Sequence, residues 1–295
     1  MPELPEVETV VRGLRPRLKG RRIRRLQIRQ PLVVRGSLAG FRRALTGARI
    51  GQVGRRGKYI LLELRPATRR ARRRWWIVHL GMTGQLYACA PTAPLLPHTH
   101  VVAWLSSGEQ LRFRDQRRFG KMLVLADAQL PAYFAALGPE PFRIGFDRFC
   151  ALFAGRRAPV KSLLLNQNRL RGLGNIYSSE ALFAAGLHPA TPAGALSRTG
   201  LTRLFRAIRR VLRKAIAGQG TTISDYRTAE GVPGDYQNYL RVYDREGEPC
   251  PRCGTRIERV VIAGRSAHFC SQCQPRFHGV QPRSRRMVLA ESQPG

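Results

Sequence analysis

The sequence predicts an α+β protein of several domains, in which an amino-terminal helix and an antiparallel β-sandwich or barrel precede a helical domain and a zinc-binding β-hairpin. Three observations support this order. Short strand-like segments separated by glycine or proline occupy residues 22–126, helical periodicity dominates residues 146–217, and two Cys-x2-Cys pairs follow. The expected domain limits are 1–137, 138–236 and 237–280, with a flexible tail over 281–295.

The first element expected is a helix over residues 5–18, because its apolar residues recur at helical spacing. Pro5 suits a first helical turn, where no backbone N–H donor is needed, and Pro16 is expected to end or kink the helix. Five arginines in residues 69–74 predict an exposed loop. The strands expected in the β region are 22–29, 59–64, 75–80, 101–105, 110–114 and 121–125.

Helical periodicity begins after Leu137-Gly138-Pro139. The last expected helix has Ser197 as its cap and Gly218 as its stop. Residues 218–234 then form a long polar loop, and loops of this length in a compact protein are usually functional or mobile. The segments expected to be helical are 146–154, 160–166, 175–185 and 197–217.

The composition favours a polyanionic partner. The 295 residues include 52 lysines and arginines against 18 acidic residues, a formal charge of +34, and only five of the basic residues are lysines. A protein this basic repels itself unless a polyanion binds it, and nucleic acid is the first candidate. The alternative is a compositional bias toward arginine spread over the surface. No segment has the ~18–20 consecutive apolar residues of a membrane span, and no signal peptide is recognised, so no membrane partner is expected.

Four of the six cysteines predict a metal site. Cys250, Cys253, Cys270 and Cys273 form two Cys-x2-Cys pairs with sixteen residues between them, the spacing of a zinc ion held by two hairpin knuckles. Four thiolates complete a tetrahedral shell and leave no position for water, so one structural Zn²⁺ is expected. The alternative, two disulfides, needs an oxidising compartment that nothing in the sequence indicates.

The amino terminus carries reactive chemistry if Met1 is removed. Pro2 then presents a secondary amine whose pKa is well below that of lysine, and amines attack carbonyl-like carbons to give Schiff bases. Glu3 and Glu6 are close enough in sequence to flank this amine, one donating a proton while the other stays ionised. The alternative is that both acids only complement the dipole of the following helix.

Taken together, the motifs resemble the formamidopyrimidine-DNA glycosylases, bifunctional repair enzymes that remove oxidised purines. They occur in family order from residue 2 to about residue 275, nearly the whole chain. Leu4 also resembles this branch of the family, because the sister endonuclease VIII branch as a rule has glycine at that position. The matching segments are Pro2–Thr9, Gly57–Tyr59, His79–Gly84, Arg117–Gly120 and Gly172–Tyr177, with Arg265 before the second zinc knuckle.

The resemblance implies a fold with a β-sandwich, a helix-two-turn-helix domain and a zinc hairpin. It also implies that the protein binds double-stranded DNA containing oxidised bases. The protein is expected to be a monomer in the bacterial cytoplasm, associated with the nucleoid. It implies that Pro2 attacks the sugar C1′ and displaces 8-oxoguanine or a formamidopyrimidine, after which β- and δ-elimination cut the strand as an AP lyase. Glu6 carries over as a supporting catalytic carboxylate. The proton donors that carry over are Glu3, Lys58 and Arg265, of which Lys58 also contacts phosphate near the lesion.

The resemblance also implies DNA-binding residues. Met82, Arg117 and Phe119 match side chains that fill the gap left when the damaged nucleotide leaves the stack. Their alternative is a core Met and Phe with a surface Arg, but glycine-bounded turns are normally exposed. The expected phosphate contacts are Asn175 at a helix start, Arg265 on the zinc hairpin, and His98.

Three features depart from the family pattern or vary within it. Asn166 stands where the family usually has Asp, residues 66–76 form a longer and more basic stretch than is usual, and the lesion-covering loop 218–234 varies within the family. Two alternative functions stay open at this point. One is an endonuclease VIII-like glycosylase for oxidised pyrimidines, and the other is a non-catalytic nucleic-acid-binding protein.

Overall fold

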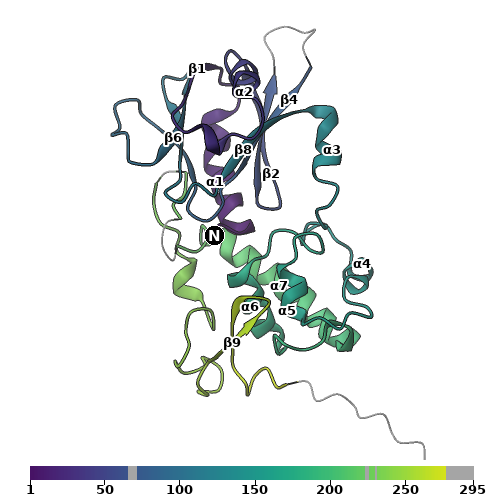
Figure 1. Cartoon of the computed structure of the whole chain (residues 1–295). Helices are drawn as coiled ribbons and strands as arrows, with labels where there is room; N and C mark the ends of the chain where they lie inside the picture. Colours follow the sequence, from purple (N-terminus) through teal and green to yellow (C-terminus); the bar gives the residue numbers. More distant parts are fainter. Residues whose placement is uncertain (66–71, 223–225, 230, 277–295) are drawn as a thin grey trace, which may run out of the picture.

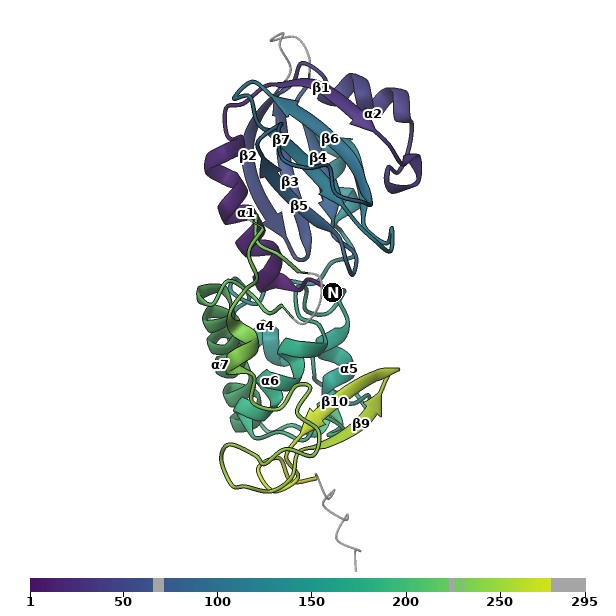
Figure 2. The ribbon, with the colours of Figure 1, turned by 90° about the vertical axis from the view of Figure 1, so that its left-hand side faces the viewer.

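The computed structural model describes residues 1–65, 72–222, 226–229 and 231–276, and these form two bodies (Figure 1). One body is rich in strands, and the other is helical and carries the carboxyl-terminal hairpin (Figure 2). The amino terminus lies at the junction between the bodies (Figure 1). The predicted fold class is confirmed: an amino-terminal helix, antiparallel sheets, a helical region and a hairpin with four cysteines.

The β body contains two four-stranded antiparallel sheets that face each other across one core. The first sheet has the order β1 (Ile23–Ile28), β6 (Thr99–Leu105), β7 (Gln110–Arg114), β5 (Gln85–Cys89). The second has the order β2 (Arg49–Arg56), β3 (Tyr59–Arg65), β4 (Arg74–His79), β8 (Lys121–Ala126).

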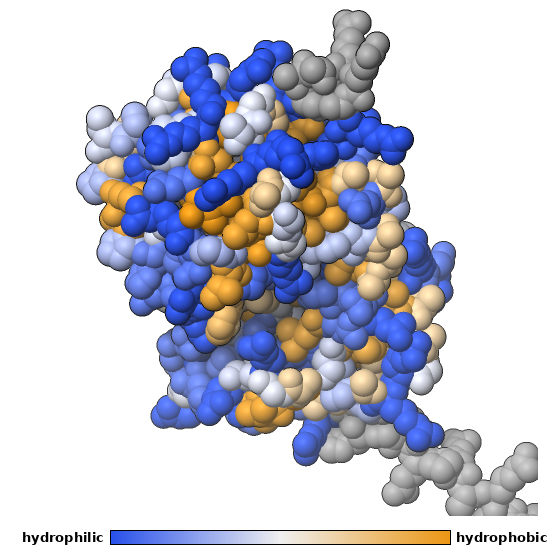
Figure 3. Space-filling model, turned by 45° about the horizontal axis from the view of Figure 1, so that its top comes forward, coloured by the Kyte–Doolittle hydropathy of each residue, from blue (hydrophilic) through white to orange (hydrophobic). Residues whose placement is uncertain are grey.

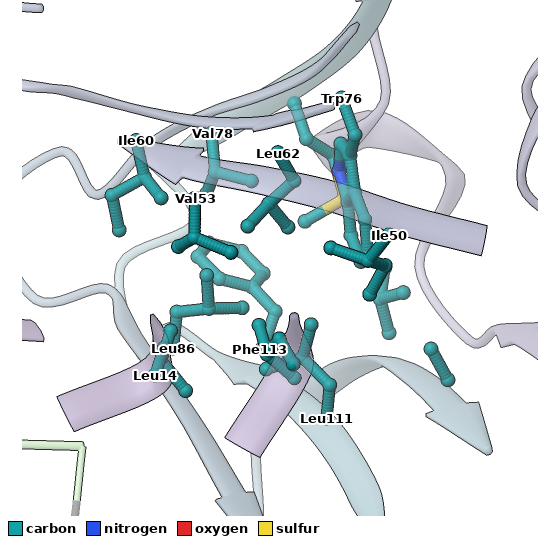
Figure 4. Close-up of a cluster of buried hydrophobic side chains, with 14 of the residues drawn as sticks. Leu14, Ile50, Val53, Ile60, Leu62, Trp76, Val78, Leu86, Leu111 and Phe113 are labelled. Atoms are coloured by element: carbon teal, nitrogen blue, oxygen red, sulfur yellow. The ribbon is translucent and has the colours of Figure 1, made fainter. Parts of the chain in front are cut away.

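Side chains from both sheets and from helix α1 (Leu4–Leu18) fill the core of this body (Figure 4). Alternate residues of β3, such as Ile60 and Leu62, point into this core, while Leu61 packs on the outer face against a short helix, α3 (Leu130–Tyr133). Both faces of the second sheet are therefore covered, which explains why β3 and β4 are almost continuously apolar.

The helices and strands of the β body that were not predicted include α2 (Leu38–Leu45), α3, β2 and β5. Strand β2 escapes recognition because it contains two glycines and three arginines, a composition that strands normally avoid. Gly51 is required there by packing, since a Cβ atom at this position would collide with the carboxylate of Glu63. Helix α1 begins one residue before the predicted range 5–18 and ends at Leu18 as predicted, so Pro16 lies inside the helix and does not end it.

The helical body contains α4 (Phe146–Ala151), α5 (Val160–Leu165), α6 (Asn175–Ala185) and α7 (Arg198–Ala217). The predicted cap of α7 is confirmed, because the Ser197 side chain accepts the N–H of Gly200 at 3.1 Å. Helix α4 ends three residues earlier than predicted. Residues 66–71, 223–225, 230 and 277–295, which include most of the basic stretch and the predicted tail, lie outside the described residues.

The first turn of α1 joins the two bodies. Leu4 belongs to the core of the helical body, while Val7 and later residues of α1 belong to the core of the β body. The Leu4 N–H donates to the Gly172 carbonyl at 2.9 Å, and Gly172 has φ of 100°, which favours glycine. The amino terminus is therefore held between the bodies by backbone as well as side-chain contacts.

The carboxyl-terminal hairpin pairs β9 (Glu258–Ile262) with β10 (Arg265–Phe269), and β10 packs beside α6.

Hydrophilic side chains cover much of the face in Figure 3, with hydrophobic patches between them. Within the described residues, no helix is long and apolar enough to cross a membrane. Short 3-10 helices occur at Pro31–Val33, Asp127–Gln129, Ala193–Ala195 and Tyr236–Tyr239.

Candidate active site

A cavity of about 570 Å³ lies at the junction of the two bodies. The amino terminus, the β body, the start of α6 and the tip of the hairpin all contribute to its walls. A larger hollow of about 800 Å³ beside α6 and α7 contains none of the predicted site residues. Predicted residues that line the smaller cavity are Pro2, Glu3, Glu6, Lys58, Met82, Asn175 and Arg265.

Glu3 occupies the amino-terminal end of α6. Its carboxylate accepts the N–H of Gly174 and, at 2.9 Å, the N–H of Ile176. A Cβ atom on Gly174 would lie 2.5 Å from the Glu3 carboxyl carbon, so only glycine allows this approach. Burial raises the pKa of Glu3, and the Lys58 ammonium partly opposes that rise. A carboxyl group with a raised pKa is suited to donate a proton near neutral pH.

Glu6 is saturated by hydrogen bonds from within the protein. Its carboxylate accepts the N–H of Glu3 at 2.7 Å, the N–H of Thr221 at 2.8 Å, and the hydroxyl of Tyr177. Burial raises the pKa of Glu6, and these hydrogen bonds oppose the rise. Glu6 thus completes the start of α1 and also ties it to α6 and to the segment after α7. The alternative that both acids only complement the dipole of α1 therefore describes part of the role of Glu6. It does not describe Glu3, whose carboxylate lies at the start of α6.

Lys58 lies on the turn between β2 and β3, where Gly57 has φ of 57°. The side chain is 5% exposed and lines the cavity. Burial lowers the pKa of Lys58. The carboxylates of Glu3 and Glu6 oppose this shift, and the charge of Arg265 adds to it. The structure therefore brings one buried ammonium close to two buried carboxyls beside Pro2.

Two exposed turns carry the predicted intercalating side chains. Met82 is 37% exposed and Phe119 is 50% exposed, so neither belongs to a core. The Arg117 guanidinium lies over the Phe119 ring, 4.6 Å from its centroid. Only Met82 of the three also lines the cavity.

Asp115 holds these two turns together and was not identified from the sequence. It is fully buried, and its carboxylate accepts the hydroxyl of Thr83 and, at 2.7 Å, the N–H of Gly120. The Thr83 hydroxyl oxygen in turn accepts the N–H of Arg117 at 3.1 Å. An Asp between a strand and a glycine-bounded turn was the available signal, but its partner Thr83 is 32 residues away.

The predicted phosphate contacts fall in two places. Asn175 is the first residue of α6, and its buried side-chain oxygen has no hydrogen-bond partner among the described residues. Arg265 begins β10 and lines the same cavity. His98 is separate: it lies in another hollow with Arg29 and Arg118, and its φ of 64° places it in the left-handed region.

The four predicted cysteines form the zinc site. Their sulfur atoms lie within 4.8 Å of one another, with Sγ–Sγ separations of 3.5 Å for Cys253–Cys270 and 3.9 Å for Cys250–Cys273. A tetrahedral zinc with Zn–S bonds of about 2.3 Å requires sulfur atoms about 3.8 Å apart. The residues therefore fit one structural Zn²⁺, which fixes the hairpin that carries Arg265.

Other residues in or beside the cavity were given no role by the sequence analysis. His79 accepts the N–H of Gly81 through Nδ1 at 3.2 Å, and burial together with Lys58 lowers its pKa to about 4, so it is neutral at pH 7. Tyr177 and Thr221 reach Glu6 from sites at least 171 residues away. At the departure from the family pattern, the Asn166 side-chain oxygen accepts the N–H of Asn168 at 2.9 Å, so an uncharged amide supports this turn.

Comparisons with known proteins agree with this geometry. Family models match residues 1–122 (formamidopyrimidine-DNA glycosylase N-terminal domain), 137–227 (the H2TH domain of the same family) and 247–276 (a zinc finger found in FPG and IleRS). A formamidopyrimidine-DNA glycosylase of Symbiobacterium thermophilum is 47% identical over 291 residues, covering 97% of this chain and 93% of that protein.

Solved structures are similar over nearly the whole chain. A Lactococcus lactis FPG mutant in complex with Fapy-dG containing DNA has a TM-score of 0.86 at 34% identity, covering 93% of this chain and 100% of that one. The MutM (FPG) protein from Thermus thermophilus has a TM-score of 0.81 at 40% identity, covering 92% and 98%. With three matching domain models and relatives above 40% identity, this chain belongs to the formamidopyrimidine-DNA glycosylase family.

Proposed function

We propose that this chain is a DNA glycosylase that removes 8-oxoguanine and formamidopyrimidines from duplex DNA and then cuts the strand as an AP lyase through Pro2. One observation carries the proposal: buried Glu3, Glu6 and Lys58 surround Pro2 in a cavity between two basic bodies. Family membership and a neighbour bound to Fapy-dG containing DNA support the substrate class.

The reaction begins after removal of Met1, which is 51% exposed at the cavity mouth. The Pro2 nitrogen attacks C1′ and loses its proton, the bond between C1′ and the base breaks, and the base leaves with that electron pair and takes up the proton. Glu3 protonates the sugar ring oxygen as the ring opens to an iminium ion. Loss of a C2′ proton then expels the 3′ phosphate, and a second elimination expels the 5′ phosphate.

The other site residues bind and shape the DNA. Met82, Arg117 and Phe119 enter the stack where the nucleotide has left, which offsets part of an unstacking cost of a few kcal/mol. Lys58, Asn175 and Arg265 hold phosphates around the cavity, with Lys58 and Arg265 also available as proton donors, and His98 binds the backbone outside it. The zinc ion takes no part in a chemical step. The chain acts as a monomer on DNA in the bacterial cytoplasm.

Borohydride trapping tests the chemistry. Reduction of the processed chain with an 8-oxoguanine duplex is expected to give a covalent adduct that peptide mass spectrometry locates at Pro2. A chain with residues added before Pro2 is the control, because its Pro2 nitrogen is a peptide amide and not a nucleophilic amine, so it should bind and give no adduct at Pro2. Absence of an adduct from chain shown by mass spectrometry to start at Pro2 would exclude the mechanism.

A panel of lesions tests the substrate class separately. The processed chain is expected to release 8-oxoguanine and formamidopyrimidines faster than thymine glycol from otherwise identical duplexes. Faster release of thymine glycol would assign the chain an endonuclease VIII-like specificity instead. Equal binding of damaged and undamaged duplex without strand cleavage would indicate a non-catalytic binding protein.

A further inference from the structure

Glu140, which the sequence analysis did not single out, is buried where the chain crosses from the β body to the helical body. It follows the connector Leu137–Pro139 and is 8% exposed. Its carboxylate accepts the N–H of Gly57 at 2.7 Å and Nη1 of Arg55 at 3.0 Å, and it forms an ion pair with Nε of Arg171 at 3.0 Å. One side chain thus binds two segments that are more than 110 residues apart.

On the β body, the contact with Glu140 fixes the turn that carries Lys58. Gly57 directly precedes Lys58, and its N–H is the donor to Glu140. Arg55 closes the same turn, since its Nη1 also donates to the Gly57 carbonyl at 2.8 Å, and its Nε donates to Glu8 of α1 at 3.2 Å. The backbone next to Lys58 is therefore held from the connector and from α1.

On the helical body, Glu140 fixes the loop that binds Glu3. Arg171 begins this loop, and its backbone N–H donates to the Pro139 carbonyl at 3.2 Å. The loop continues to Gly172, whose carbonyl accepts the Leu4 N–H, and to Gly174, whose N–H binds the Glu3 carboxylate. Gly57 and Arg171 also touch directly: a Cβ atom on Gly57 would lie 3.3 Å from Cδ of Arg171.

We propose that Glu140 is a positioning residue that sets the placement of Lys58 relative to Glu3 by binding both of the segments that hold them. The inference rests on the proposed function, because it assigns Glu140 a part in base excision. Lys58 and Glu3 belong to different segments, and a displacement of about 1 Å between reacting groups can cost about 10²-fold in rate. Affinity for the DNA backbone is summed over several contacts, of which Lys58 is one, so the same displacement should cost far less in affinity than in rate.

Glu63 is a matched control within the same body. Its carboxylate is also buried, accepts one backbone N–H, from Gln52 at 2.8 Å, and pairs with two arginines, Arg65 at 3.1 Å and Arg73 at 3.5 Å. It differs from Glu140 in two respects. It binds no residue next to a predicted site residue, and its arginines are 59% and 52% exposed, whereas Arg55 and Arg171 are 10% and 18% exposed. Removing the Glu140 carboxylate leaves two largely buried arginines without their acceptor, so the loss of stability should be larger for Glu140 than for Glu63, and the rates are compared per folded molecule.

The test compares Glu140→Ala and Glu140→Gln with Glu63→Ala and Glu63→Gln in the zinc-loaded chain processed to Pro2. For Glu140→Ala we expect single-turnover release of 8-oxoguanine to fall by about tenfold or more, with little change in affinity for a duplex containing an uncleavable abasic analogue. Glu140→Gln retains an oxygen for the Gly57 N–H and is expected to recover part of the rate. The Glu63 variants should keep the wild-type rate per folded molecule.

The pH profile adds a readout that a loss of stability does not move. Lys58 lowers the pKa of Glu3, so separating the two groups in Glu140→Ala should shift the decline of the excision rate to higher pH. The same shift should be absent from the Glu63 variants. If Glu140→Ala fails to fold, the Glu140→Gln rate and pH profile decide the outcome.

Two results would overturn the inference: equal rates per folded molecule for the Glu140 and Glu63 variants, or a Glu140 variant that loses affinity as much as rate. A wild-type chain that releases no damaged base would instead contradict the proposed function itself. The two failures are therefore distinguishable in the same set of measurements.

Discussion

The amino-terminal carboxylates and the two exposed turns that carry Met82, Arg117 and Phe119 belong to the same proposed DNA-binding site but are built in opposite ways. Glu3 and Glu6 are each 2% exposed, and between them they accept five hydrogen bonds from the protein. Phe119 and Met82 are 50% and 37% exposed, and the Arg117 guanidinium lies over the Phe119 ring. Proton transfer needs fixed atoms and a controlled pKa, whereas filling a gap in the base stack needs a free apolar surface.

The difference extends to what supports each region. The carboxylates depend on contacts from α6 and from the segment after α7, so both bodies must be assembled before they are in place. The turns depend on Asp115 and Thr83, which lie entirely within the β body. Changes in the first region should therefore affect chemistry and stability together, and changes at the tips of the turns should affect DNA recognition alone.

The largest effect is expected for Glu3→Gln, which removes the proposed proton donor from the buried region. A positioned general acid contributes about 10²–10⁴-fold, so single-turnover release of 8-oxoguanine should fall by that factor while duplex affinity is kept. Quench-flow or gel assays of base release, with affinity measured on an abasic-analogue duplex, provide both quantities. A variant with the wild-type rate would remove Glu3 from the mechanism.

A smaller effect of the opposite kind is expected for Phe119→Ala in the exposed turn. Stacking on an aromatic side chain contributes about 1–3 kcal/mol, so affinity for a lesion duplex should fall by about 5- to 150-fold. The free energy of unfolding should change by less than about 0.5 kcal/mol, since the ring is half exposed. Fluorescence anisotropy measures the affinity, and chemical denaturation measures the free energy of unfolding. A clear loss of stability would contradict the proposed difference between the two regions.

The smallest effect is expected in the pH dependence of stability, and only in the buried region. Burial raises the pKa of Glu3 above its ordinary value of 4.5, so the folded chain binds more protons than the unfolded chain above that pH. The stability contributed by the protonated group is complete below pH 4.5 and is lost as pH rises through the folded pKa. The difference in stability between Glu3→Gln and wild type should therefore move in favour of the variant as pH rises, by no more than about 1.4 kcal/mol per pH unit.

Denaturant titrations at several pH values measure that difference. Phe119→Ala is the control and should show a constant offset from wild type at every pH, because no ionisable group changes. A difference between Glu3→Gln and wild type that is independent of pH between 4.5 and 7 would contradict the raised pKa of Glu3.

Much of the fold follows from local sequence signals. Ser197 and Gly218 mark the ends of α7 correctly, because caps and stops act within one turn. The cysteine spacing identifies the zinc site for a similar reason, since each knuckle is a local turn. Strand β2 has no such local signal. Its Gly51 is explained by the neighbouring carboxylate of Glu63 on β3, and the local sequence of β2 does not reveal that contact.

The candidate site shows the same difference between local and distant information. The sequence alone predicted its members, Pro2 and Glu3 from their chemistry, and Lys58, Asn175 and Arg265 from the resemblance of their motifs to the family. Only the tertiary structure decided that Glu3 faces α6 rather than its own helix, and that Glu140 binds both of the segments that hold Lys58 and Glu3. The physical reason is distance along the chain: burial, pKa and alignment come from partners up to 215 residues away, and no local pattern encodes them.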